Sequence, residues 1–306
     1  MSGPPTAAAT AASALASRSR PSSDAGYWRR SWQRLARDRV GVAAGCVLLI
    51  VVVLAFTGPL LSSRVLAYSP TQQILNDQFA DPGPRHWLGA DQFGRDTLTR
   101  LIYGAQVSLS VAALTTIIAL SLGTAIGLTA GYYGGRTEAI LMRLMDVLLA
   151  IPPLFLFILL AMLFRPNTLS LAVILASTGW LHVARLVRGE ALTIKHLDFI
   201  LAARSTGATN ARLMLRHVLP GVMPVLVVAA SVTVGTTILS EAALGFLGLG
   251  IQPPTPTWGN MIADAQYLIS HTLYPLLFPG IAIFVSVLAV NVFGNAARDA
   301  LDPRLS

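Results

Sequence analysis

The side chains that most often carry chemistry are few in this chain of 306 residues, and their spacing forms no catalytic or metal-binding set. Two histidines at His-Glu-x-x-His spacing would share one helix face and bind zinc, but no such pair occurs. The single cysteine, Cys46, excludes an intramolecular disulfide and a thiolate cluster. A Gly-x-Ser-x-Gly turn for a serine nucleophile is also missing. The sequence therefore predicts no catalytic residue, metal or cofactor in this chain, whose histidines are His86, His182, His196, His217 and His271.

ATP chemistry is also missing from the sequence. A phosphate-binding loop needs the pattern Gly-x-x-x-x-Gly-Lys-Ser/Thr, which places a lysine beside the bound phosphates. The only lysine is Lys195, and it follows Ile194 rather than a glycine. Any step driven by ATP must therefore take its energy from a partner.

Composition sets the environment in which these residues act. Apolar residues make up 54% of the chain and charged residues 12%, and the mean hydropathy is +0.64. A helix needs about 20 mostly apolar residues to cross the hydrocarbon core of a bilayer. Six uncharged windows of about this length occur, which leaves too little polar sequence to cover them in a soluble protein. We therefore expect an all-α integral membrane protein with six transmembrane helices, over residues 40–61, 107–133, 147–164, 169–184, 218–240 and 274–293.

The distribution of basic residues predicts the side of the membrane that each segment occupies, because short cytoplasmic segments retain Lys and Arg. Of the 22 basic residues, 17 lie in the N-terminal segment, the second and fourth gaps between spans, and the C-terminal segment. We therefore expect a multi-pass protein of the plasma or inner membrane, with both termini and the fourth gap in the cytoplasm. The net charge of +8 then reflects topology and gives no reason to expect a nucleic acid partner.

The chain divides into a short N-terminal part and a larger core. Residues 1–26 are rich in Ala, Ser, Thr and Pro, which predicts a disordered cytosolic tail. Residues 27–39 place Trp28 and Trp32 on one face and arginines on another, as in an amphipathic helix at the surface of a membrane with anionic lipid. The other predicted divisions are a first span (40–61), an external loop (62–106), a core domain with five spans (107–297) and a cytosolic tail (298–306).

The fourth gap is longer and more patterned than a simple connection between two spans requires. Residues 198–220 predict two short helices around a turn, with Gly207 at the reversal. Thr209 or Asn210 can cap the second helix, and Pro220 is expected to close it where the fifth span begins. The apolar residues that helical spacing places toward the core are Leu197, Ile200 and Leu201 before the turn and Ala211, Met214, Leu215 and Val218 after it.

Four motifs in the chain resemble one family. The run from Leu201 to Gly207, followed after nine residues by His217 to Pro220, resembles the EAA loop of permease subunits in binding-protein-dependent ABC importers. The spacing of that motif is kept, although Leu201 replaces its glutamate and His217 replaces a hydrophobic residue. Three more stretches are similar to the second-permease type of the dipeptide, oligopeptide and nickel branch of this family, and the resemblance as a whole covers residues 28–306. These stretches are residues 86–96, 241–250 and 298–304.

The resemblance implies a type I ABC importer permease fold in which the 198–220 loop is a coupling helix that contacts a separate ATPase subunit. It also implies the partners: a homologous second permease, two ATP-binding subunits that carry ATP and magnesium, and an extracytoplasmic substrate-binding protein. Such an assembly imports small peptides (dipeptides or oligopeptides) or related solutes by alternating access. The residues implied in coupling are Ala202, Ala203, Arg204, Gly207, Ala208, Arg212, Arg216, Leu219 and Pro220.

Two sets of residues are candidates for roles toward the external side. Glu241 is an ionisable residue at the outer end of the fifth span, beside Gly245 and Gly248. Two interpretations stay open for it: a residue of the gate or translocation path, or a structural acid with a partner. The second set lies in external gaps rich in turn-forming residues and is a candidate for docking of the binding protein. It consists of Asp91, Arg95 and Trp258.

Three other classes of protein fit the sequence less well. A secondary transporter would need ionisable relays within the membrane and an internal repeat, and Glu241 alone does not make such a relay. A membrane-embedded enzyme would need a nucleophile or metal set, and a receptor-like scaffold gives no reason for the turn at Gly207. We therefore expect a transport subunit that is not an enzyme. Transport that survives without an ATPase partner would favour the secondary transporter.

Overall fold

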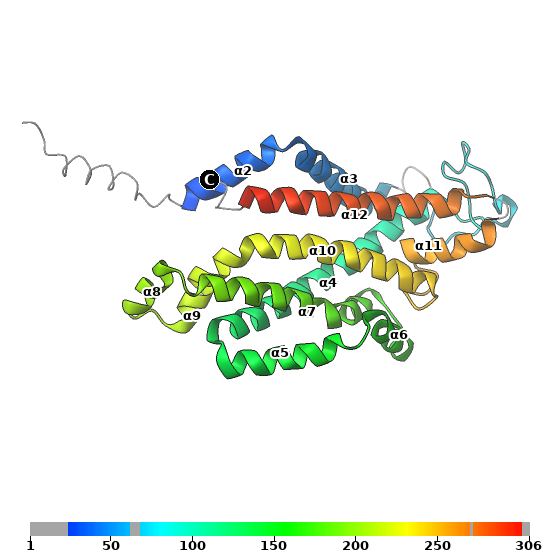
Figure 1. Ribbon diagram of the computed structural model, residues 1–306. Coiled ribbons are helices and arrows are strands. Elements are labelled where there is room, and N and C mark those ends of the chain that lie inside the picture. Colours follow the sequence, from blue (N-terminus) through cyan, green and yellow to red (C-terminus); the bar gives the residue numbers. More distant parts are fainter. Residues whose placement is uncertain (1–23, 62–67, 270–271, 302–306) are drawn as a thin grey trace, which may run out of the picture.

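The computed structural model describes residues 24–61, 68–269 and 272–301. Most of these residues are helical, and the described part contains no β-strand, only an isolated bridge between Ala90 and Asp96. The helices drawn in Figure 1 are α2 (Asp24–Arg37), α3 (Arg39–Leu61), α4 (Thr97–Tyr133), α5 (Gly135–Leu149), α6 (Pro153–Leu163), α7 (Thr168–Ile194), α8 (Asp198–Ser205), α9 (Asn210–Leu213), α10 (Leu219–Phe246), α11 (Trp258–Ala265) and α12 (Tyr274–Leu301). Short 3-10 turns cover Leu75–Asp77 and Gln266–Leu268, and a π-helical segment covers Met214–Val218.

Five helices of the described part are long and apolar enough to cross a membrane: α3, α4, α7, the continuous helix Asn210–Phe246, and α12. The pair α5 and α6 forms a sixth apolar unit, bent by 76° at the break between them. The long helices run side by side, with α8 and α9 at one end and α6 and α11 at the other (Figure 1). The described chain begins with α2 and ends with α12 at the end that carries α8 and α9 (Figure 1). The predicted all-α membrane fold is confirmed.

The third predicted span, 147–164, is wrong as a single helix. α5 ends at Leu149 and α6 begins at Pro153, so the uncharged window joins the last turn of one helix to all of the next. Pro152 and Pro153 cause the break, because proline has no N–H to donate within a helix and disfavours helical geometry in the residue before it. With 11 residues, α6 is about 16 Å long, which is too short to cross the hydrocarbon core by itself.

The fourth predicted span, 169–184, ends too early. α7 runs through Thr168–Ile194 because the two arginines that follow residue 184 have partners on α5 and do not end the helix. Arg185 lies 2.5 Å from Asp146, and Arg188 pairs with Glu138. α7 therefore extends beyond the apolar stretch and carries the chain out to α8.

The predicted boundaries at both ends of the core also move outward. α4 begins at Thr97, not near residue 107, because Asp96 caps it by accepting a hydrogen bond from the Thr99 backbone N–H at 2.8 Å. The external loop predicted over 62–106 is therefore about ten residues shorter, and its residues 62–67 lie outside the described part. At the other end, α12 continues to Leu301, past the boundary predicted at residue 297.

The N-terminal part consists of two helices, as predicted. α2 is joined to α3 at Asp38, whose side chain accepts a hydrogen bond from the Val40 backbone N–H at 3.1 Å. α2 begins at Asp24, earlier than the predicted residue 27, and residues 1–23 of the predicted tail lie outside the described part. Trp32 is 72% exposed, which leaves its ring available to a membrane surface.

The tightest contact between long helices joins α4 to α7. Gly123, Gly127 and Gly131 follow one another at four-residue spacing along α4 and face α7. A Cβ atom at these three positions would lie between 2.5 and 2.8 Å from a backbone oxygen atom of α7. No side chain fits there, so the two backbones touch directly, as small residues at this spacing allow in membrane helices.

Gly127→Ala is expected to destabilise the protein, although alanine favours a helix over glycine by about 1 kcal/mol. The new methyl group would meet the Ala184 oxygen at 2.5 Å and Val187 Cβ at 2.8 Å, so the helices must move apart. Gly189→Ala is the matched control, because nothing lies within 4 Å of that position on α7. Thermal unfolding in detergent should give a lower midpoint for the first variant and an equal or higher one for the second. Equal midpoints would contradict the close contact.

Candidate functional site

The loop predicted as a helix–turn–helix has that shape. α8 and α9 are joined by a tight turn in which Gly207 adopts a φ of +85°, a conformation that suits glycine. The turn closes α8 because the Ala208 N–H donates to the Ala203 oxygen at 3.1 Å. Thr209, not Asn210, caps α9 by accepting a hydrogen bond from the Arg212 N–H at 3.4 Å. We call residues 198–216 the hairpin.

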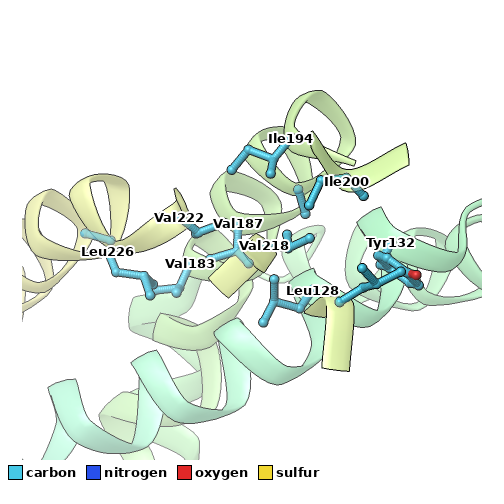
Figure 2. Close-up of a cluster of buried hydrophobic side chains, with 12 residues drawn as sticks. Leu128, Tyr132, Val183, Val187, Ile194, Ile200, Val218, Val222 and Leu226 are labelled. Carbon is cyan, nitrogen blue, oxygen red and sulfur yellow. The ribbon is translucent and has the colours of Figure 1, made fainter. Parts of the chain in front are cut away.

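One buried apolar cluster attaches the hairpin to the helix bundle (Figure 2). Ile200 of α8 and Leu213 of α9 are fully buried and form the inner side of the hairpin. They pack against side chains from the ends of three long helices, so the hairpin cannot move without moving them. The other buried members are Leu128 and Tyr132 of α4, Val183, Val187, Ala191 and Ile194 of α7, and Val218, Val222, Leu226 and Ala229 of the continuous helix.

Tyr132, at the end of α4, adds polar contacts to the same attachment. Its hydroxyl donates to Asn210 Oδ1 at 2.9 Å and accepts a hydrogen bond from the Arg204 guanidinium at 3.1 Å. That guanidinium also lies 5.7 Å from the centre of the Tyr132 ring, within range of a cation–π contact. Lys195 donates to the Gly131 oxygen at 2.8 Å and so places a cation at the C-terminus of α4. Tyr132 thus joins both arms of the hairpin.

The outer side of the hairpin is exposed and partly apolar. Leu201 is 46% exposed, Phe199 51% and Leu215 64%, and Arg212 and Arg216 are exposed beside them. Such a surface, apolar and flanked by cations, is typical of a site that another protein covers. The other residues implied in coupling are also at or near the surface: Ala202 and Pro220 are exposed, and Ala203, Ala208 and Leu219 are half-buried.

The sequence misassigned part of the inner face. Leu197, Leu201, Ala211 and Leu215 were expected to face the core, but they are exposed, and Leu213 is buried instead. For the residues after the turn, the cause is the π-helical segment that follows α9, where i→i+5 bonding shifts the face that a regular helix would present. The structure gives no such cause for Leu197 and Leu201, which precede the turn. Pro220 does not close the second helix either. The helix continues from Asn210 to Phe246, and the missing proline N–H falls where the π segment joins α10.

At the opposite end, the 86–96 motif folds around buried ion pairs. Asp91 Oδ2 lies 2.6 Å from Arg95 Nε and also accepts from Arg100, and Asp264 Oδ2 of α11 lies 3.0 Å from each of the two arginines. His86 lies between two carboxylates, 2.9 Å from Asp96 and 3.3 Å from a second aspartate. These pairs connect the loop to the start of α4 and to α11.

The three residues predicted to dock the binding protein are buried in the structure. Asp91 is 4% exposed, Arg95 5% and Trp258 1%, and the Trp258 ring N–H donates to the Leu101 oxygen at 3.2 Å. All three side chains lie inside the fold and shape the end of the chain opposite the hairpin. The same loop does present Trp87, 59% exposed, at its surface. Docking of a binding protein at this end stays a prediction.

Glu241 is fully buried where α4, α10 and α11 meet. One of its carboxylate oxygens accepts a hydrogen bond from the Ser108 hydroxyl at 2.9 Å, and the other has no hydrogen-bond partner among the described residues. Gly245 allows the adjacent close contact, because a Cβ atom there would lie 2.9 Å from Gly259 Cα. Gly248 forms the turn that ends α10, at a φ of +73°. The structural-acid interpretation therefore accounts for one oxygen of Glu241, and its role in a gate stays open.

Sequence reasoning missed three residues that organise these sites: Tyr132, Arg100 and Asp264. Tyr132 lies at the end of an apolar window and gives no polar pattern. Arg100 was counted only as a charge in an external loop. Asp264 lies 164 residues from Arg100 along the chain, so only the fold brings the two together.

The fold is thus a bundle of helices of membrane length with a basic helical hairpin at one end, and comparison with known proteins gives its class. Residues 123–306 match the family described as the binding-protein-dependent transport system inner membrane component, and residues 26–82 match the N-terminal TM domain of oligopeptide transport permease C. The chain belongs to this family of inner membrane transport components. It is therefore a multi-pass transport subunit and not an enzyme, as predicted.

Several relatives are similar over nearly the whole chain. The glutathione transport system permease protein GsiD of Pectobacterium atrosepticum is 38% identical over 91% of both chains. The dipeptide transport system permease protein DppC of Bacillus subtilis is 39% identical over 91% of this chain and 86% of its own, and the oligopeptide permease OppC of the same species is 32% identical over 91% and 90%. A chain from a solved structure of the inward-facing MetNI methionine ABC transporter has the same fold, with a TM-score of 0.57 and 19% identity over 67% of this chain and 97% of that one.

Tyr132→Phe is expected to loosen the hairpin, because it removes both hydrogen bonds of the hydroxyl, each worth about 0.5–1.5 kcal/mol. Tyr133→Phe is the matched control, since Tyr133 is 55% exposed and does not belong to the cluster. Hydrogen–deuterium exchange should become faster over residues 198–213 in the first variant only. Unchanged exchange in Tyr132→Phe would show that the apolar cluster alone holds the hairpin.

Proposed function

We propose that this chain forms one half of the translocation path in an ATP-driven importer of small peptides. In this proposal the hairpin contacts an ATP-binding subunit and transmits its movement to the membrane helices. The exposed apolar and basic outer side of the hairpin is the observation that carries this proposal. An apolar surface with Leu215 64% exposed is costly in water, and a groove in a partner would cover it.

The attachment of the hairpin supports a mechanical role. Its inner side is packed and hydrogen-bonded to the ends of α4, α7 and the continuous helix, so a displacement of the hairpin reaches three long helices at once. A rigid element of this kind can transmit a rigid-body movement, provided that its partner has two states with different affinities for it. ATP and magnesium are bound by the partner in this proposal, and the chain itself carries no cofactor.

Membership of this family supports the other parts of the proposed assembly. A homologous second permease supplies the other half of the translocation path, two ATP-binding subunits act from the cytoplasm, and a substrate-binding protein delivers the solute outside. Relatives named for dipeptide, oligopeptide and glutathione transport support a small peptide as the solute. Alternating access then moves it inward.

Gly207→Val should weaken coupling, whereas Gly207→Asn should keep it. A β-branched residue is strained at a φ of +85°, while asparagine tolerates this region, and the space around the position is open in both cases. A strain of about 1–3 kcal/mol at the contact predicts that ATP-dependent uptake by the reconstituted complex falls roughly fivefold or more in the valine variant. Wild-type uptake by the valine variant would contradict the proposed role of the turn, and so would uptake that needs no ATP-binding subunit.

The hairpin is expected on the cytoplasmic side together with both termini. In a Cys46→Ser background, a membrane-impermeant maleimide should label Thr206→Cys in inverted vesicles but not in intact spheroplasts. Tyr267→Cys, at a residue 79% exposed near the opposite end of the molecule, should show the reverse pattern. Labelling of Thr206→Cys in spheroplasts would reverse the topology and remove the proposed contact with ATP-binding subunits.

A further inference from the structure

An open pocket lies at the end of the molecule opposite the hairpin. Its volume is about 670 Å³, and its walls come from the turn between α6 and α7 and from the loop that follows α10. Both segments lie at the same end of the bundle (Figure 1). The polar side chains that line it are Arg165, Asn167, Thr168, Gln252 and Thr255.

Among the described residues, Arg165 is the only charged side chain that lines this pocket, and it is exposed. It makes no ion pair or hydrogen bond within the described part of the chain, whereas the other described arginines at this end all have acidic partners: Arg85 with Asp77, and Arg95 and Arg100 with Asp91. No Asp or Glu of the described segments lines the pocket. The pocket therefore holds one cation without a counter-charge.

The groups around Arg165 favour an anion of modest size. The Asn167 side-chain oxygen is occupied by the N–H groups of Leu169 and Ser170, at 3.0 and 2.9 Å, so the free polar group of this side chain is its amide donor. Gln252 donates to the Gly248 and Gly250 oxygens, both at 2.9 Å, which fixes that side chain against the turn. A guanidinium with amide and hydroxyl donors beside it matches the geometry of a carboxylate.

We propose that this pocket receives a carboxylate group of the transported solute and that Arg165 binds it. The inference rests on the proposed function for two points: that this end faces outward, and that the solute is a short peptide, which ends in a carboxylate. A volume of about 670 Å³ lies within the range of small-molecule sites, of roughly 300–1,000 Å³, and this favours a solute over the flat surface of a docked protein. The pocket would accept the solute before it enters the path between the two permeases.

Protection of Arg165 from chemical modification tests the site without transport. The full chain in lipid nanodiscs is treated with phenylglyoxal, and modification at each arginine is followed by peptide mass spectrometry in the presence of Ala-Ala or its C-terminal amide. Ala-Ala should slow modification of Arg165 severalfold and the amide should not. Arg85, whose side chain is 82% exposed, is the internal reference and should be unaffected by either peptide. Equal rates at Arg165 with both peptides would overturn the proposal.

Variants in the assembled importer provide the second test. Arg165→Gln should raise the KM for uptake of Ala-Ala roughly tenfold, as loss of a charge-assisted hydrogen bond implies, and Arg165→Lys should have a smaller effect. Docking of the empty binding protein should be equal in both variants and wild type. If Arg165→Gln instead weakens that docking and leaves the KM unchanged, the occupant is an acidic group of the binding protein and the proposal is wrong.

The two tests separate this proposal from the proposed function. If the complex hydrolyses ATP and imports Ala-Ala while neither protection nor the KM shift is seen, only the pocket proposal fails. If no peptide is imported by a complex that retains its ATP-binding subunits, the proposed function fails, and protection of Arg165 still reports on the pocket.

Discussion

The direct contact between the backbones of α4 and α7 fixes the position of everything at the hairpin end of the molecule. In lipid, no hydrophobic force drives two helices together, so close packing of small residues must supply the attraction. The glycines of α4, each four residues from the next, let the two helices touch along three successive turns. That contact brings Leu128 and Tyr132 beside Val187 and Ala191, and these side chains form the surface on which the hairpin rests (Figure 2). If α4 and α7 were farther apart, the hairpin would lose the apolar surface against which it packs.

The continuous helix Asn210–Phe246 links the hairpin to the opposite end. Its 37 residues span about 55 Å, and it begins within the hairpin, passes through the π segment and ends beside α11. At that end Glu241 and Gly245 contact α4 and α11, where the buried ion pairs of Asp91, Arg100 and Asp264 fix the loop that precedes α4. One helix therefore connects the hairpin, which is proposed to contact an ATP-binding subunit, to the end of the molecule that is proposed to bind the solute. Irregular π geometry at Met214–Val218 is a natural place for such a helix to change its direction, since π segments interrupt regular bonding.

Much of this arrangement could be predicted from local sequence, and the rest depends on distant contacts. The membrane-length helices follow from uncharged windows, and the turn at Gly207 from its residue type and spacing. The break at Pro152 was hidden because it lies inside a run without charges, and the end of α7 was misplaced because Arg185 looks like the end of a span until its partner Asp146 is known. The inner face of α9 was misassigned since helical periodicity assumes α geometry, which the π segment interrupts. At the end opposite the hairpin, Asp91 and Arg95 were expected at the surface because a polar loop usually is exposed, but they are buried in ion pairs that also include Arg100 and Asp264.

The account depends most on the claim that an ATP-binding subunit covers the outer side of the hairpin. The direct measurement is photo-cross-linking in the assembled complex, with p-benzoylphenylalanine in place of Leu215, and with the same substitution at Tyr267 for comparison. We predict an adduct between this chain and the ATP-binding subunit at position 215 and no such adduct at position 267. Adducts at position 215 with lipid or the second permease alone, in a complex that contains the ATP-binding subunits, would contradict the claim.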